Sequence, residues 1–199
     1  MSPRKYNKTK REATSDVIRH QILEATLELH SKKGIFGTSW KDIAKRADVS
    51  LATVYNYFPS LDELVPACGD LMYSIAQPPS LESANEVFTN ITSIEERLAL
   101  LVKTFFDFYE RGEPYLNIDQ QERTLDSVQE WEAYLKSLIE NYTRSALKPI
   151  KPNKKNIETI SAFLDVSVFL AFRRRGMTRF EIEKTMNNLL LCWINNHTS

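Results

Sequence analysis

The chain has 199 residues, of which 42% are hydrophobic, 11% are aromatic and 26% are charged. This composition is typical of a folded protein with one or two compact units and a substantial core, and it excludes general disorder. The sequence has no run of about eighteen apolar residues and no charged-then-apolar leader, so we expect a cytoplasmic protein without a membrane span.

The formal net charge of zero conceals an uneven distribution of charge. Residues 1–60 hold 11 Lys and Arg against 6 Asp and Glu, a net charge of +5, whereas residues 61–199 hold 15 against 20, a net charge of −5. We predict a flexible basic arm over residues 1–14, whose cations are Arg4, Lys5, Lys8, Lys10 and Arg11. Such an arm either follows a DNA backbone or minor groove or is a solvated tail, and the sequence leaves both interpretations open.

The first helix is expected from about Ser15 to Lys33, because basic residues in a last turn and a following Gly34 are typical of a helix end. A second helix begins after Ser39, which we expect to be its N-cap, with Asp42 in the first turn. Its apolar residues form one buried stripe: Ile43, Ala44 and Ala47.

A tight turn and a third helix follow. Asp48 tolerates the left-handed backbone of such a turn, and Ser50 is expected to cap a helix over Leu51–Tyr57. That helix ends there because Phe58 precedes Pro59, and the residue before a proline is forced out of the helical region. Two short helices joined in this way form a helix-turn-helix, the arrangement that inserts its second helix into a DNA major groove. An ordinary packed helical hairpin is the alternative interpretation.

The stretch from Ile22 to Leu64 closely resembles the N-terminal domain of the TetR (tetracycline-repressor) family of bacterial transcription regulators. The matching residues are Ile22-Leu23, Ala25, Leu29, Gly34, Gly37, Thr38-Ser39, Ile43-Ala44, Ala47, Val49-Ser50, Thr53, Tyr55 and Tyr57-Phe58. Three positions depart from the family pattern: Asp48 and Ala52, where glycine is common, and Leu61, where many members have a phosphate-binding lysine. The resemblance implies a three-helix DNA-binding domain over residues 15–59.

Hydroxyl, amide and small apolar side chains of this region suit base edges and phosphates. We predict that Thr53 and Asn56 contact base edges and that Leu51 and Ala52 touch thymine methyl groups or bases. The remaining predicted DNA contacts, mainly to phosphates, are Thr38, Ser39, Lys41, Ser50, Tyr55 and Tyr57.

Residues 60–199 show helical periodicity without a convincing alternating strand pattern, so the fold class predicted is all-α, with about nine helices. The resemblance implies that this part is a ligand-binding and dimerisation domain. A helix starting at Ser60 contains Pro66, where we expect a kink that is either a hinge or a simple bend. The later helices are expected over residues 94–111, 115–126, 127–147, 157–172 and 180–194.

The last two expected helices are apolar on more than one face, which is typical of burial on two sides. One side then belongs to the chain's own core and the other to a second subunit, although a fully buried core helix has the same pattern. The resemblance implies a two-fold dimer joined through these helices, which would bind an inverted-repeat operator. The candidate interface residues are Phe163, Val166, Phe169, Leu170, Leu190 and Trp193.

Aromatic residues of the middle helices are candidates for the walls of a ligand pocket, although such residues are more often core. Asp165 lies in an apolar stretch, where a carboxylate needs a partner. It could meet a cationic ligand, pair with Arg144 or Arg173, or lie at an exposed helix edge. The candidate ligand-binding residues are Phe105, Tyr109, Trp131, Tyr134 and Asp165.

The sequence contains no phosphate-binding glycine loop and no GxSxG or HExxH motif, and its histidines and cysteines lack metal-ligand spacing. We therefore expect no enzyme activity, no cofactor and no metal. The predicted function is that of a dimeric repressor that responds to an unidentified small molecule and binds a palindromic operator. The alternatives are a DNA-binding regulator of the same fold controlled by a protein partner, and an all-helical enzyme.

Overall fold

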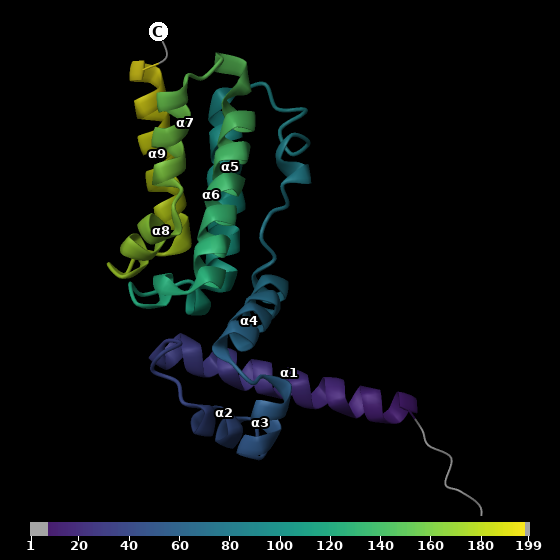
Figure 1. Cartoon of the computed structure of the whole chain (residues 1–199). Coiled ribbons are helices and arrows are strands. Elements are labelled where there is room, and N and C mark those ends of the chain that lie inside the picture. The colour runs from purple at the N-terminus through teal and green to yellow at the C-terminus, as the bar shows by residue number, and fades with distance from the viewer. Residues whose placement is uncertain (1–7, 198–199) are drawn as a thin grey trace, which may run out of the picture. The chain divides into compact units, whose positions relative to one another are not determined.

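The computed structural model describes residues 8–197, and the regular structure of this part of the chain is helical, as the sequence predicts (Figure 1). The described residues form two compact units. Unit 1 runs to Met72 and includes the distant segment Ile118–Glu122, whereas unit 2 holds Tyr73–Asn117 and the chain from Arg123 onward. The α-helices are α1 (Lys8–Lys33), α2 (Trp40–Arg46), α3 (Leu51–Tyr57), α4 (Leu61–Ala76), α5 (Ile94–Gly112), α6 (Asp126–Leu147), α7 (Lys154–Phe163), α8 (Val166–Arg173) and α9 (Arg179–His197).

In unit 1, α1 packs against α2, and α2 packs against α3. The core between them is apolar and fully buried, with Ile22 from α1, Ile43 from α2 and Val54 from α3. Helix α1 begins at Lys8, so the expected start near Ser15 was wrong. The predicted arm is therefore helical from Lys8, and its cations Arg4 and Lys5 lie outside the described residues.

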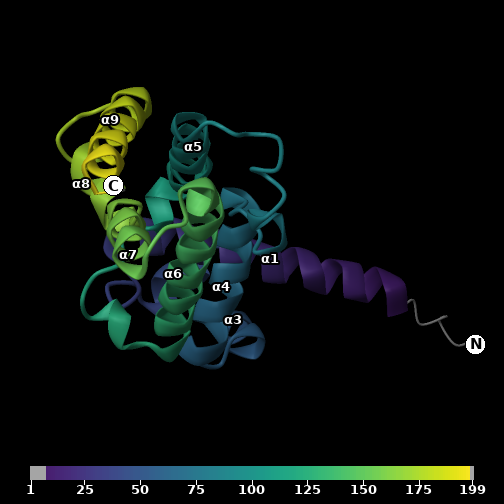
Figure 2. The same ribbon diagram turned by 90° about the horizontal axis from the view of Figure 1, so that it is seen from above.

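In unit 2, α5 and α6 lie side by side, α9 packs against α5, and α7 packs against α6 (Figures 1 and 2). Aromatic rings fill the space between these helices. The Phe105 and Tyr142 rings meet edge to face at 5.5 Å, and the Phe106 and Phe169 rings lie 5.2 Å apart. Edge-to-face and tilted contacts of this kind stabilise a core beyond simple burial of area.

A buried arginine fixes one end of unit 2. The Arg97 guanidinium donates to the carbonyl oxygens of Ser145 and Ala146, both at 2.8 Å, and to that of Phe88 at 2.7 Å. It also donates to the Ile91 carbonyl and lies over the Phe88 ring. Ser145 and Ala146 are in the last turn of α6, so the cation lies at the negative end of that helix and bonds its terminal carbonyls. Burial lowers the pKa of Arg97 from its ordinary value.

Two expected helices of the C-terminal half have different bounds in the structure. The prediction of a single helix over residues 157–172 was wrong, because the helix is interrupted before Asp165 and divides into α7 and α8. Asp165 is the N-cap of α8, with its Oδ1 accepting from the Ser167 backbone N–H at 2.8 Å. The helix expected over residues 115–126 is replaced by two single 3₁₀ turns, Glu113–Tyr115 and Glu122–Thr124.

Candidate nucleic-acid interface

Serine caps and one left-handed residue build the helix-turn-helix. The Ser39 side chain accepts from the Asp42 N–H at 3.1 Å at the start of α2, and Ser50 accepts from the Thr53 N–H at 3.0 Å at the start of α3. Between the two helices Asp48 has a φ of 55°, the left-handed conformation predicted for this turn. Each expected cap is confirmed, so the two helix starts are fixed by local chemistry.

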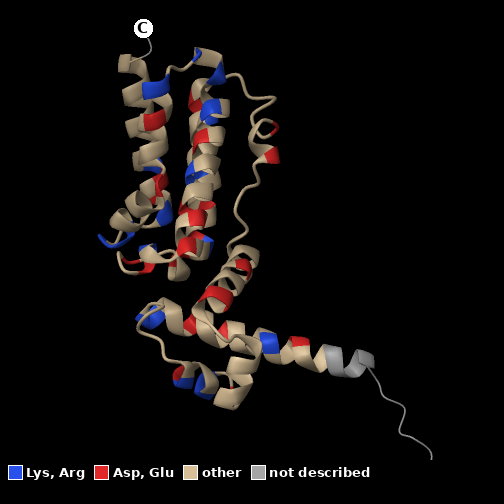
Figure 3. Cartoon of the chain, viewed as in Figure 1, with Lys and Arg blue, Asp and Glu red and all other residues tan. Residues whose placement is uncertain are grey.

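Helix α3 presents an uncharged surface. It has neither acidic nor basic side chains, whereas α2 carries both signs of charge (Figure 3). Val54 and the following Phe58 are buried in the core of unit 1, as their spacing predicts. The exposed side chains of α3 are Ala52, Tyr55 and Asn56, while Leu51, Thr53 and Tyr57 are half-buried. Such a mixture can donate to and accept from base edges and can contact thymine methyl groups.

Two aromatic rings join the N-terminal end of α2 to the exposed side of α3. Trp40 and Tyr55 lie with ring centroids 5.1 Å apart and planes tilted by 30°. Tyr55 remains 44% exposed, so the contact with Trp40 does not bury the residue. Trp40 is absent from the predicted set. The only signal for it in the sequence is a large aromatic residue at the first position of a short polar helix.

Like the capping serines, Thr38 and Tyr57 of the predicted phosphate contacts use their hydroxyl groups inside unit 1. The Thr38 hydroxyl donates to the Gly34 carbonyl at 2.8 Å, and the Tyr57 hydroxyl is 2.9 Å from that of Ser15 in α1. Both side chains are half-buried. A hydroxyl oxygen retains accepting capacity in such contacts, but these two groups first serve to hold the fold.

Ion pairs tie some of the cations near α2 to neighbouring acids. Lys33 Nζ lies 3.2 Å from Asp42, and Arg46 pairs with Glu28 of α1. Hydrogen bonds from Lys32 and Arg46 lower the pKa of the Glu28 carboxyl, and hydrogen bonds from Lys33 and Ser39 lower that of Asp42. Lys41 is exposed on the same helix.

The candidate ligand-binding residues differ in how deeply they are buried. Phe105 and Tyr109 are fully buried in the aromatic core, and the Tyr109 hydroxyl donates to the Leu164 carbonyl at 2.7 Å. Burial, with a smaller contribution from the charge of Asp165, raises the pKa of Tyr109. Asp165 is exposed and acts as a helix cap, which is the exposed-edge alternative.

Trp131 and Tyr134 of α6 are half-buried. The Tyr134 hydroxyl lies 3.4 Å from that of Tyr73, and this contact is the main reason that the pKa of Tyr134 rises to about 12. A pair of neutral phenols of this kind offers both donors and acceptors.

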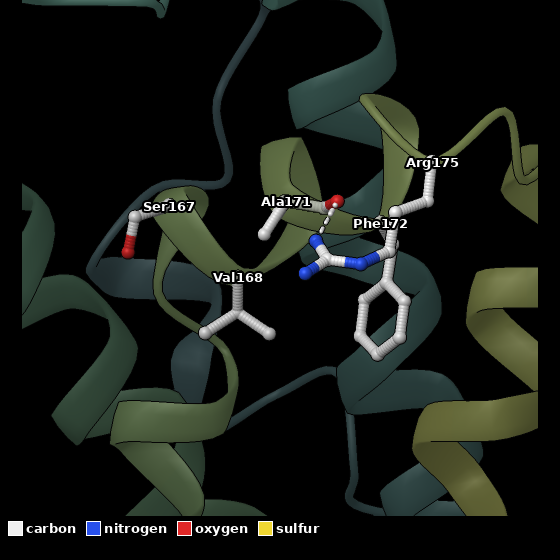
Figure 4. Close-up of a pocket in the computed structure, with 5 residues that line it drawn as sticks. All are labelled: Ser167, Val168, Ala171, Phe172 and Arg175. Atoms are coloured by element: carbon white, nitrogen blue, oxygen red, sulfur yellow. Dashed lines mark hydrogen bonds between the residues drawn. The ribbon is translucent and has the colours of Figure 1, made fainter.

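A shallow pocket lies along one side of α8, next to Asp165, whose Oδ1 accepts from the N–H of the lining residue Ser167. Figure 4 shows that its lining alternates small, apolar and basic groups, with the Arg175 guanidinium donating to the Ala171 carbonyl at 2.8 Å. The residues that line it are Ser167, Val168, Ala171, Phe172 and Arg175. None of them belongs to the predicted ligand set.

Half of the predicted dimer residues are buried by the chain's own core. Phe169, Leu170 and Leu190 face inward, so placing them at an interface was wrong. Phe163 remains exposed, and Val166 and Trp193 are half-buried. Two apolar side chains outside the predicted set are more exposed than Phe163, namely Phe180 at 73% and Leu189 at 45% exposure. Apolar residues on all sides of a helix do not reveal which side the protomer itself covers.

Within residues 8–197, no group of three or more His, Cys, Asp and Glu side chains is arranged to hold a metal ion. In the same part of the chain, every helix is too short or too polar to cross a lipid bilayer.

Part of the chain matches a known protein family. Residues 22–68 match the model for bacterial regulatory proteins of the tetR family. The chain is 45% identical to the HTH-type transcriptional regulator LuxR of Vibrio harveyi over 47 residues, and 50% identical to the HTH-type transcriptional repressor KstR of Rhodococcus jostii over 42 residues. These alignments cover 24% and 21% of this chain, and only 23% and 20% of the two relatives.

The whole fold also has a relative among solved structures. The multidrug binding protein EbrR, complexed with imidazole, superposes with a TM-score of 0.57 at 18% identity, covering 96% of this chain and 92% of EbrR. At this identity the likeness concerns the fold alone. The matched segment contains the caps, the left-handed turn and the exposed α3 described above, and over residues 22–68 the chain is similar to the bacterial regulatory proteins of the tetR family.

Proposed function

We propose that this chain is a sequence-specific DNA-binding regulator that acts as a repressor. The proposal rests on the exposed surface of α3. This helix is capped by Ser50, has no charged side chain, and exposes Ala52, Tyr55 and Asn56. Sequence is read by hydrogen bonds and apolar contacts at base edges, and charge contributes mainly sequence-independent affinity. TetR-family regulators are not enzymes, so the enzyme alternative is set aside.

The predicted contacts divide into readers and anchors. Asn56 has the amide that pairs with adenine in the major groove, and Ala52 and Leu51 suit a thymine methyl group. Thr53 Oγ1 lies 2.8 Å from Ser50 Oγ, so it would reach a base while sharing a hydrogen bond with its own cap. Ser39, Lys41 and Tyr55 surround these readers as phosphate contacts, and Thr38, Ser50 and Tyr57 complete the set.

We propose a two-fold dimer formed through α7–α9. The exposed Phe163, Phe180 and Leu189 support it, because large apolar side chains in water are typical of an interface. Two recognition helices related by a two-fold axis read an inverted repeat, with half-sites one helical turn, about 34 to 36 Å, or a multiple apart.

A small-molecule effector that binds unit 2 is the proposed signal. The multidrug binding protein EbrR, which shares the fold, supports this class of effector. The competing proposal is a regulator controlled by a protein partner, and the burial of the Phe105 and Tyr109 rings in the aromatic core is compatible with it.

Selection of bound sequences from a random DNA pool tests the proposed function. The purified protein is used at about 0.15 M salt, where weak phosphate binding is partly suppressed. Enrichment of an inverted repeat is expected. A pool that stays random after repeated rounds would leave no sequence-specific reader.

A further inference from the structure

A short segment from the middle of the chain is part of the DNA-binding unit. Ile118–Glu122 lies in the connection between α5 and α6, yet it belongs to the same compact unit as α1–α3. Its partner is the corner between α1 and α2. The Ile35 N–H donates to Glu122 Oε1 at 2.5 Å, a contact that joins residues 87 positions apart in the chain.

Both oxygens of the Glu122 carboxylate accept hydrogen bonds. Besides the Ile35 contact, Oε2 accepts from the Asp119 N–H at 2.9 Å, and Asp119 Oδ1 in turn accepts from the Glu122 N–H at 2.8 Å. The Glu122 residue is only 4% exposed. Glutamates are almost never this buried unless their charge is satisfied, and bonds from N–H groups to a carboxylate are among the strong hydrogen bonds of proteins.

The corner that Glu122 binds is where the chain leaves α1. Gly34 ends α1 with a φ of 74°, and its carbonyl accepts from the Thr38 hydroxyl just before α2. A Cβ atom at Gly34 would lie 2.9 Å from Glu122 Oε1, closer than such atoms normally approach. Glycine is therefore favoured here both by the left-handed backbone and by the close approach of the carboxylate.

We propose that Glu122 is a positioning residue of the DNA-binding unit, and that Ile118–Glu122 is the element through which the connection between α5 and α6 sets DNA affinity. The hydrogen bond fixes the corner that leads from α1 into α2, and α2 carries α3. The residues on both sides of this segment, Asn117 and Arg123, belong to unit 2. A change in the spacing of α5 and α6 is therefore transmitted to Glu122 along the covalent chain. The proposal rests on the DNA-binding function proposed above.

Hydrogen exchange in the free, full-length protein tests the contact without DNA. In Glu122→Ala the Ile35 amide loses its acceptor, and we expect it to exchange on the order of tenfold faster, with helix content unchanged. Glu122→Gln keeps one carbonyl acceptor and should give a smaller increase, and it carries the test if Glu122→Ala does not fold. The matched control is Glu130→Ala, an exposed acid of α6. Equal Ile35 exchange in wild type and both Glu122 variants would overturn the proposal.

A double-mutant cycle tests whether Gly34 and Glu122 act on each other. Gly34→Ala is strained by its backbone in any background, but the clash with Oε1 exists only when Glu122 is present. The loss of stability from Gly34→Ala should therefore be smaller in the Glu122→Ala background than in the wild type. Additive effects would contradict the contact.

DNA binding tests the coupling. With the sequence enriched by the wild type, Glu122→Ala should bind at least about fivefold more weakly, and operator DNA should slow exchange of the 118–122 amides, because coupling is reciprocal. If the wild type enriches a sequence and Glu122→Ala binds it equally well, the coupling is wrong. If the wild type enriches nothing, the proposed function fails, whereas the exchange experiment still decides the contact.

Discussion

His30 is a mostly buried histidine of α1, and burial lowers its pKa to about 4. Its Nε2 is a buried atom without a hydrogen-bond partner among the described residues. Because the unfolded chain has a histidine pKa of about 6.5, the unfolded state binds more protons between pH 6.5 and 4, and folding stability falls as the pH falls through this window. Between pH 7 and pH 5 we expect His30 to account for a loss of up to about 2 kcal/mol of unfolding free energy.

The measurement is urea unfolding of the wild type and His30→Leu at both pH values. The variant should lose less stability on acidification than the wild type. An identical pH dependence for the two proteins would show that His30 titrates normally in the folded state.

Helix α8 depends on a single capping residue. The Asp165 side chain accepts from the Ser167 N–H, one of the unpaired donors at the helix start. Loss of such a cap costs about 0.5 to 2 kcal/mol, so Asp165→Ala should lower the urea midpoint, while Asp165→Asn, which also caps well, should retain most of the stability. Equal destabilisation by both variants, measured under the same conditions, would mean that the negative charge matters rather than the cap.

The elements that the sequence predicts well are those with local signals. Helix α3 begins and ends at the predicted residues because Ser50 caps it and Pro59 stops it. Asp165 has equally local chemistry, but a continuous apolar pattern on both sides conceals the break between α7 and α8.

Contacts between residues distant in the chain carry no local signal. In the sequence Arg97 looks like an ordinary charged residue, yet in the structure it is buried and donates to carbonyl groups about 50 residues away. Glu122 likewise reads as a surface acid, and only the folded chain brings it to Ile35. The same limit applies to the predicted interface, since the covered side of α8 and α9 depends on how the protomer packs.

The exposed apolar residues of α7–α9 predict a dimer. Leu189→Asp would place a charge in that interface, where an unpaired charge is costly, and we expect the variant to sediment as a monomer at micromolar concentration. Val17→Asp is the control, because Val17 is an apolar residue of unit 1 that is even more exposed than Leu189. Analytical ultracentrifugation should find a dimer for the wild type and for this control. If the wild type is a monomer, the proposal that two recognition helices of a dimer bind an inverted repeat has no basis.

The central claim is that α3 reads bases, and Asn56→Ala tests it most directly. Wild type and variant are compared in the same selection from random DNA. We predict that the variant loses preference at one base pair in each half-site, worth about 1 to 3 kcal/mol of discrimination, and keeps its preferences elsewhere. A variant that binds every sequence more weakly but with unchanged preferences would contradict base reading by α3.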